Sequence, residues 1–276
     1  MSPALIEPVV AAIARRIGIP ARGTLESSDV IMIEPAEVTR TRGFAVRLKM
    51  GWRSLEASFV PGRFARHLVR RMGQAVPESQ IAFCALAAAR VERSRAIVNV
   101  NGAPLDLANA ESWPVEWKTF ELSLRRERIV PEELSPKELK EILSSLAVPV
   151  FGMIVSLIGV GEVEGDDSTL EGSSVETISR RYERKPINRE ICLALKGRRC
   201  WCCRMEFGEK YGPETEGMIE VHHRIPVAGM GPRYRVHPVR DLFPVCGNCH
   251  SVIHLNHLPQ DPDALRKQLD RAAARR

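Results

Sequence analysis

Cysteine and histidine residues between positions 200 and 254 have the types and spacing that bind metal ions. Cys200 and Cys203 form one C-x2-C pair, and Cys246 and Cys249 form a second. Two such pairs supply four thiolates to a tetrahedral zinc ion. Reduced cysteines buried without a metal are the alternative, which the paired spacing disfavours. The pattern therefore predicts a structural zinc site.

The other cysteines are expected to have different roles. Cys202 lies inside the first pair, where the two-residue gap favours the outer two cysteines as ligands. Cys84 and Cys192 lie on apolar helical patterns, so we expect them in the hydrophobic core.

Histidines near the cysteine pairs indicate a second metal ion. His250 and His254 are four residues apart, so on a helix they share one face. His222 and His223 end the strand-like stretch "MIEVHH", in which consecutive side chains point to opposite faces. One histidine of this doublet can face a metal ion while the other faces a substrate. The remaining histidines are expected on the surface or in the core: His67, His237 and His257.

Hydrophobic periodicity predicts an α+β domain before these residues. Apolar residues at helical spacing predict helices at 3–17, 61–75, 77–94 and 135–146. Alternating apolar and polar residues predict strands at 43–50, 53–60, 96–102 and 115–124. Ser135 is expected to cap the last helix without a full capping box. The apolar run 146–160 is short for a membrane span, so we expect a buried helix kinked near Pro149 and Gly152.

The stretch "GEVEGDDSTLEGSSVETIS" (161–179) divides the chain. It is acidic, rich in glycine and serine, and has neither helical nor strand periodicity, which is typical of a linker. The predicted domains are therefore 1–160 and 180–276, joined by the acidic linker 161–179.

Charge and the N-terminal stretch suggest a compartment and a partner. The formal net charge is +6, with most of the excess in the last hundred residues, which fits phosphate contacts with a nucleic acid. Glu7 interrupts the first apolar stretch, and the arginines follow it, unlike a secretory signal. We therefore expect a cytoplasmic protein with reduced cysteines and no membrane partner. The oligomeric state stays open, with a homodimer as one alternative.

Three stretches resemble successive blocks of the HNH endonuclease family: "YERKPINREICLALKGRRCWCCRMEFGEKYG", "GMIEVHHRIPV" and "DLFPVCGNCHSVIH". The likeness covers about residues 180–257 and is to the subgroup similar to methylcytosine-dependent restriction nucleases, with a four-cysteine zinc. It implies a C-terminal ββα-metal nuclease domain: a strand with the His doublet, a long connection, a strand through "LFPV", and a helix near His250. Nothing in residues 1–160 resembles a known family.

The resemblance also implies residue roles. His222, His250 and His254 would bind a catalytic ion, Mg2+ or another divalent cation, and His223 would be the general base. Cys200, Cys203, Cys246 and Cys249 would hold the structural Zn2+. The middle Asn of the family motif is replaced by Asp241, which can accept the same hydrogen bonds and brace the loop that holds the base. Phosphodiester hydrolysis needs a water deprotonated near neutral pH and a cation beside the phosphate.

The implied function is a metal-dependent DNA endonuclease in restriction or phage defence, with modified DNA as one candidate target. The connection 224–240 offers arginines for phosphate contacts: Arg224, Arg233, Arg235 and Arg240. Residues 1–160 are expected to recognise the target. Trp52, Trp113 and Trp117 are candidates for stacking on a flipped base, although tryptophans more often lie in a core. The alternative function is a non-catalytic, zinc-dependent DNA-binding module, against which the histidine set argues.

Overall fold

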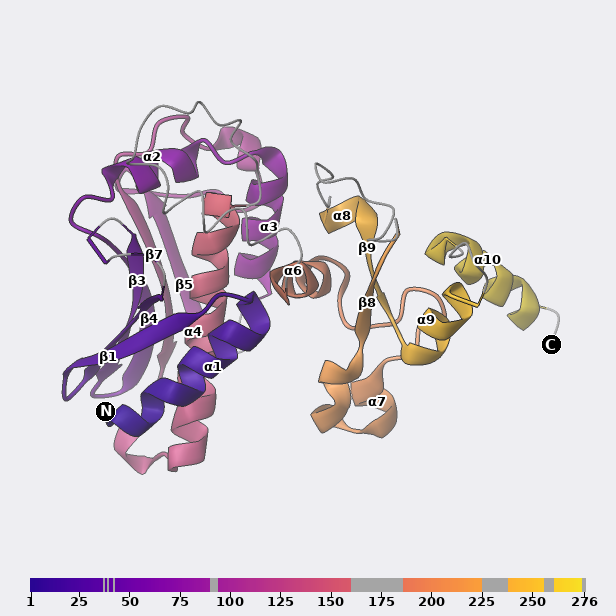
Figure 1. Ribbon diagram of the computed structural model, residues 1–276, viewed down its shortest axis with the longest axis horizontal. Helices are drawn as coiled ribbons and strands as arrows, with labels where there is room; N and C mark the ends of the chain where they lie inside the picture. Colours follow the sequence, from indigo (N-terminus) through magenta and orange to yellow (C-terminus); the bar gives the residue numbers. More distant parts are fainter. Residues whose placement is uncertain are drawn as a thin grey trace. The chain divides into compact units, whose positions relative to one another are not determined.

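The chain folds into two compact units, Met1–Ile187 and Asn188–Arg276 (Figure 1). This computed structural model describes residues 1–36, 38, 40–41, 43–89, 94–159, 186–224, 238–255 and 261–274. Helices and strands occur in both units, so the mixed α+β class predicted from the sequence is confirmed. The predicted linker, 161–179, lies outside the described residues.

A seven-stranded antiparallel sheet forms the centre of the N-terminal unit, in the order β1-β2-β3-β4-β7-β5-β6. The strands are β1 (Ala21–Ser27), β2 (Val30–Pro35), β3 (Phe44–Gly51), β4 (Ser54–Pro61), β5 (Ser94–Val100), β6 (Ala103–Pro104) and β7 (Phe120–Glu127). Three of the predicted strands are β3, β4 and β5. The strand expected from residue 115 begins only at Phe120, and neither β1 nor β2 was predicted.

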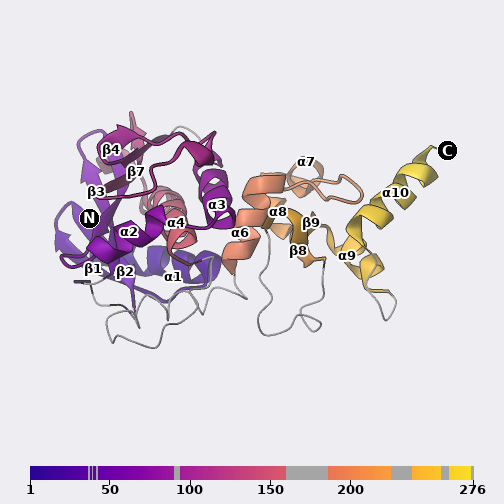
Figure 2. The same cartoon turned by 90° about the horizontal axis from the view of Figure 1, so that it is seen from above.

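Helices cover one face of this sheet (Figure 2). They are α1 (Ile6–Ile17), α2 (Arg66–Gly73), α3 (Pro77–Ala88) and α4 (Pro136–Gly159), with the 3-10 turns Pro3–Leu5, Ala110–Ser112 and Pro131–Glu133. The helix expected from residue 61 starts later, because Pro61 is still paired with Phe44 at the end of β4. The helix expected to reach residue 94 ends at Ala88, because Ser94 already begins β5.

The longest helix, α4, lies in the core of the N-terminal unit. It joins the predicted segments 135–146 and 146–160 into one helix with Pro149 inside it. Ser135 N–H donates to Glu138 Oε2 at 2.9 Å, and Glu138 N–H donates to Ser135 Oγ at 3.3 Å. The capping box is therefore complete, and the expected partial cap was wrong. By length and composition α4 could cross a membrane, but 78% of its most apolar window is buried inside the protein.

The C-terminal unit is built around a small two-stranded antiparallel sheet. Its elements are α6 (Pro186–Lys196), α7 (Phe207–Tyr211), the 3-10 turn η5 (Pro213–Met218), β8 (Glu220–His223), α8 (Pro238–Asp241), β9 (Leu242–Val245), α9 (Gly247–Ile253) and α10 (Pro262–Ala273). In the sheet, His222 lies opposite Phe243 and His223 lies opposite Leu242. The strand, strand and helix that the family resemblance implies correspond to β8, β9 and α9.

Candidate metal centres

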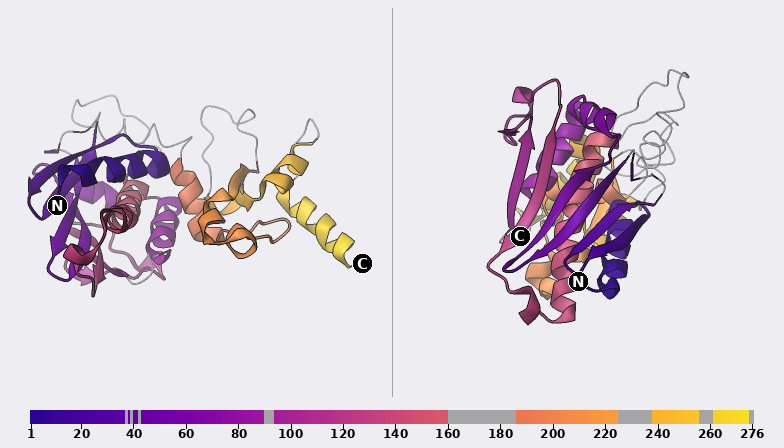
Figure 3. Two further views of the ribbon diagram at one scale, coloured as in Figure 1. Left: turned by 90° about the horizontal axis from the view of Figure 1, so that it is seen from below. Right: turned by 90° about the vertical axis from the view of Figure 1, so that its left-hand side faces the viewer.

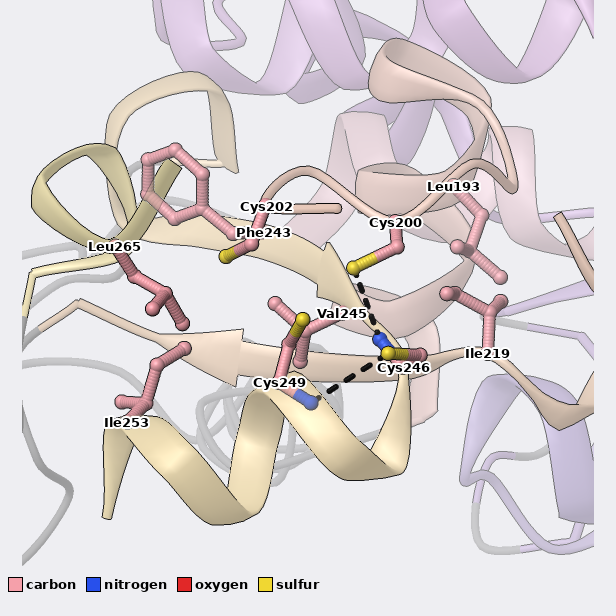
Figure 4. Packing of buried hydrophobic residues seen from close by; sticks show 10 residues of the cluster. All are labelled: Leu193, Cys200, Cys202, Ile219, Phe243, Val245, Cys246, Cys249, Ile253 and Leu265. Carbon is pink, nitrogen blue, oxygen red and sulfur yellow. Dashed lines mark hydrogen bonds between the residues drawn. The ribbon is translucent and has the colours of Figure 1, made fainter. Parts of the chain in front are cut away.

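Four cysteine side chains from two distant segments meet in the C-terminal unit. One ligand atom from each of Cys200, Cys203, Cys246 and Cys249 lies within 4.8 Å of all the others. The first two belong to the turn before α7, and the last two lie at the start of α9. Cys246 is the N-cap of α9, and its sulfur accepts from Cys249 N–H at 3.5 Å (Figure 4). The cluster could bind a metal such as zinc, as the cysteine spacing predicts.

The electrostatics of the cysteine cluster fit a bound cation. Backbone N–H of Cys246 donates to Cys200 Sγ at 3.3 Å, which favours a thiolate there. A hydrogen bond from Cys202 is the main cause that lowers the pKa of Cys200 to about 4. Burial raises the pKa of Cys203 to about 11, and burial and the charge on Cys200 raise that of Cys249. Because these two pKa values are raised, Cys203 and Cys249 would be thiolates at neutral pH only with a cation beside them.

Three of the four clustered cysteines lie in the hydrophobic core of this unit, whereas Cys203 is exposed. Figure 4 shows the cysteines among Leu193, Ile219, Val245, Ile253 and Leu265, all of which are buried. Trp201 packs edge-on against Phe243, with ring centroids 5.3 Å apart. Because the cluster and the apolar side chains form one core, loss of the metal would also disturb the packing of the sheet and α9.

Two further cysteines have the surroundings of core residues. Cys192 is fully buried on α6, and burial raises its pKa to about 12. Cys84 is half-buried on α3, and burial likewise raises its pKa. Neither thiol belongs to the four-cysteine cluster.

Three histidines form a second cluster beside the cysteines. One ring nitrogen from each of His222, His250 and His254 lies within 4.8 Å of the other two. Ring centroids are 5.3 Å apart for His222 and His250, 5.0 Å for His222 and His254, and 4.9 Å for His250 and His254. His222 comes from β8, whereas the other two lie on α9 and at its C-cap, separated by one helical turn. The spacing of four residues thus places both on one face, as predicted.

The inner nitrogen of His222 indicates that this cluster fits a metal. His222 is 3% exposed, and within the described part of the chain its Nε2 atom is buried without a hydrogen-bond partner. Burial, with smaller contributions from the charges of His250 and His254, lowers its pKa to about 4. A neutral imidazole is the form that coordinates metal ions. Imidazole donors suit first-row transition metal ions better than Mg2+, which prefers oxygen.

Glu220 is a site residue that the sequence analysis missed. Its Oε2 atom lies 2.5 Å from Nδ1 of His250, and its other oxygen lies against Gly247 at the start of α9. A carboxylate in this position fixes the ring orientation and the tautomer of a metal-binding histidine. The sequence carried a signal for it, because Glu220 precedes His222 by two residues and therefore shares its face of β8.

His223 has surroundings distinct from those of the cluster. It is half-buried on β8 and is not among the three clustered histidines. Burial lowers its pKa, and the charge of Asp241 opposes that shift. Asp241 is buried, accepts from Arg240 Nε at 3.0 Å, and its backbone carbonyl accepts from Arg224 N–H at 2.8 Å. Asp241 thereby connects the end of the histidine strand to the start of β9.

The described arginines of the connection have protein partners. The Arg224 guanidinium lies 4.6 Å from the centre of the Phe243 ring and forms ion pairs with Asp263 and, at 3.4 Å, Asp261. These contacts fasten the start of α10 to the small sheet. Arg240 pairs with Asp241 while its side chain is 66% exposed. Arg233 and Arg235 lie outside the described residues, so DNA contacts by these arginines stay predictions.

Comparisons with known proteins do not identify a relative. No family model, curated protein or solved structure matches the chain. The likeness to HNH endonucleases thus rests on the sequence motifs and stays a prediction.

Replacing Cys246 with serine should remove zinc and unfold the C-terminal unit. A structural zinc supplies on the order of 10 kcal/mol to the folding of small domains, and Cys246 is both a ligand candidate and the cap of α9. Metal analysis of Cys246→Ser should show one equivalent of zinc fewer than the parent, and calorimetry should show one thermal transition lost. Cys84→Ser is the matched control, and it should keep the parent's zinc. Equal zinc content in Cys246→Ser and the parent would exclude the assignment.

Replacing Glu220 with glutamine should weaken metal binding at the histidines without unfolding the unit. Loss of such an orienting carboxylate typically lowers metal affinity about 10- to 100-fold. Titration with Co2+ or Mn2+, followed by calorimetry, measures the change. Glu214→Gln, at an exposed position on η5, is the control. Equal affinity in Glu220→Gln and the parent would show that Glu220 does not position His250.

Proposed function

We propose that the C-terminal unit is a metal-dependent DNA endonuclease of the HNH type. The observation that carries the proposal is the His222–His250–His254 cluster, in which the buried His222 Nε2 has no hydrogen-bond partner among the residues that the structure describes. A buried polar atom without a partner costs about 1–3 kcal/mol, so its retention favours a ligand at this position. The order of β8, β9 and α9 and the family motifs support the same function.

The three histidines would hold a divalent cation. When bound, such a cation stabilises negative charge on the phosphate and on the leaving oxygen. His222 would supply its buried Nε2 atom, and Glu220 would keep the His250 ring turned toward the same point. Three neutral side chains leave coordination positions for substrate and water. Since the donor set is imidazole, we expect Mn2+ or Co2+ to bind more tightly than Mg2+.

His223 would accept the proton from the attacking water. Alternation along β8 turns its side chain away from the face that carries His222, so it stays available for proton transfer. The buried Asp241 lies next to Leu242, the strand partner of His223, and its charge acts on the imidazole. We infer that Asp241 positions the general base His223, a role that asparagine has in the family motif.

A nuclease of this kind would act on DNA in restriction or phage defence, and modified bases are one class of target. The competing proposal is a zinc-dependent DNA-binding module without catalytic activity.

Incubating supercoiled plasmid with the full chain and Mn2+, Co2+ or Mg2+ distinguishes the two proposals. Nicked or linear product with a divalent cation supports the nuclease. Intact plasmid with every ion, together with retained DNA binding, supports the binding module. If a chelator is used to remove ions from the histidines before each test ion is added, metal analysis must show that zinc is still bound at the cysteines.

Replacing His223 with alanine should abolish most cleavage while leaving metal binding intact. General-base catalysis typically contributes about two to four orders of magnitude to the rate. Single-turnover cleavage rates and Mn2+ affinity should be measured for His223→Ala and for His67→Ala, a change at an exposed histidine in the other unit. Parent-like cleavage by His223→Ala would refute its role as the base. Loss of metal affinity would mean that the doublet's roles are reversed.

Replacing His254 with alanine should produce a different defect, one that responds to metal concentration. His254 is exposed at the end of α9, so its removal should cost one ligand without unfolding the unit. Raising Mn2+ should therefore restore part of the cleavage rate in His254→Ala, whereas His223→Ala should not respond. A metal dependence in His254→Ala identical to that of the parent would exclude it from the ligand set.

A further inference from the structure

The N-terminal unit has an exposed tryptophan at the tip of a hairpin. β3 and β4 are joined by a two-residue turn, Trp52 and Arg53, and Trp52 is 81% exposed. Trp113 and Trp117 are 8% and 2% exposed, because they pack together against Phe83 and Phe120 in the core. Folding therefore explains two of the three tryptophans noted from the sequence. It does not explain Trp52, whose indole contributes no burial.

Sheet register gathers charged side chains beside this hairpin. Lys49 lies opposite Glu56, and Glu56 lies opposite Arg125, so the three share one face of the sheet. That face is opposite the one that α1 and α4 cover, and in the right panel of Figure 3 the strands of this unit lie in front of the helices. The Lys49 and Arg125 side chains are exposed. These residues form the floor of an open hollow of about 450 Å³.

A strained residue borders the same hollow. Arg128 follows β7 with a φ of 59°, a left-handed conformation that residues other than glycine rarely adopt. The next residue, Ile129, donates its N–H to the Arg53 carbonyl at 3.5 Å, so the two turns are joined. The Arg53 guanidinium lies 5.8 Å from the centre of the Trp52 ring. Strained backbone of this kind is concentrated at ligand sites, and here it belongs to a second arginine that lines the hollow.

The composition of the hollow matches one chemical class of ligand. Its cations are Lys49, Arg53, Arg125 and Arg128, against the carboxylates of Glu56 and Glu127. An excess of positive charge beside an exposed aromatic ring matches a nucleotide, in which a flat base is linked to phosphates. The carboxylates can accept hydrogen bonds from an exocyclic amino group, such as that of cytosine. An anionic membrane would match the cations and the indole, but neither the carboxylates nor a recessed site.

We propose that this hollow binds an unpaired nucleotide of DNA, with its base stacked on Trp52 and its phosphates contacted by Arg53, Arg125 and Arg128. The choice of DNA rests on the proposed nuclease function, whereas the nucleotide chemistry rests on the hollow. Stacking requires a base outside the duplex, so single-stranded DNA is the appropriate probe.

The experiment measures binding separately from cleavage. Fluorescence anisotropy of a labelled mixed-sequence 12-mer of single-stranded DNA is recorded with the full-length protein, without added divalent cation. Trp52→Ala should weaken binding roughly 5- to 150-fold, the usual value of one base–aromatic stack, and Trp52→Phe should restore most of it. Arg128→Gln should weaken binding. It should also lower the slope of the logarithm of the binding constant against the logarithm of the salt concentration by about one, because one phosphate contact is lost. Phe64→Ala is the matched control, because Phe64 is also exposed, with the Arg63 guanidinium 5.6 Å from its ring centre.

Three results would overturn the proposal. They are no measurable binding by the parent, equal binding by Trp52→Ala and the parent, or equal losses in Trp52→Ala and Phe64→Ala. Binding to phosphatidylserine vesicles that depends on Trp52, without DNA binding, would assign the hollow to a membrane surface instead. Plasmid cleavage by the parent with unchanged binding in Trp52→Ala would refute this site alone. Trp52-dependent binding without cleavage under any ion would refute the nuclease alone.

Discussion

The C-terminal unit depends on the meeting of four cysteine sulfurs, three of them from buried residues, at a site that could bind a metal ion. Cys200 and Cys203 are brought to Cys246 and Cys249 across the small sheet, and the four ligand atoms lie within 4.8 Å of one another. The sheet itself has two strands of four residues each, and such a hairpin is marginal in water by itself. A cation bound by the cysteines would stabilise their thiolate forms and would close a long loop between the two pairs. A metal ion at this site would therefore contribute to the stability of the whole unit.

The two candidate metal centres are mechanically connected through α9. Cys249 and His250 are neighbours on this short helix, so a metal that fixes the first also fixes the second. The other side of the histidine cluster comes from β8, whose pairing with β9 sets the depth of His222. Glu220 joins the two elements directly, because it lies on β8 and contacts the His250 ring. Although β8 and α9 are short, they can hold the histidines in place, because β8 pairs with β9 and α9 begins at the cysteine cluster.

The sequence was sufficient for the parts of the site that spacing determines. Paired cysteines and histidines four apart are local patterns, and the structure brings together the four cysteines and the His250–His254 pair that they indicated. Spacing alone left open which histidine of the doublet joins them, and the family resemblance implied His222. Glu220 was missed because its role depends on contact with a helix thirty positions later. The strands β1 and β2 were missed because β1 is largely exposed and β2 is a short apolar run, so neither alternates clearly. Helix and strand boundaries near Pro61 and Ser94 depended on pairing partners that local periodicity does not contain.

The tryptophans also show that the local sequence does not determine whether a side chain is buried. Trp52, Trp113 and Trp117 have the same side chain in similarly polar stretches, yet two are core residues and one is exposed. Their tertiary surroundings differ: Trp113 and Trp117 precede β7 and pack with Phe83 and Phe120. Trp52 lies in a hairpin turn, where Arg53 is 5.8 Å from its ring centre and the indole is 81% exposed. A buried indole has a sufficient explanation in packing. The proposed nucleotide site would give the exposed Trp52 a function, just as metal coordination would give one to the buried nitrogen of His222, which has no hydrogen-bond partner among the described residues.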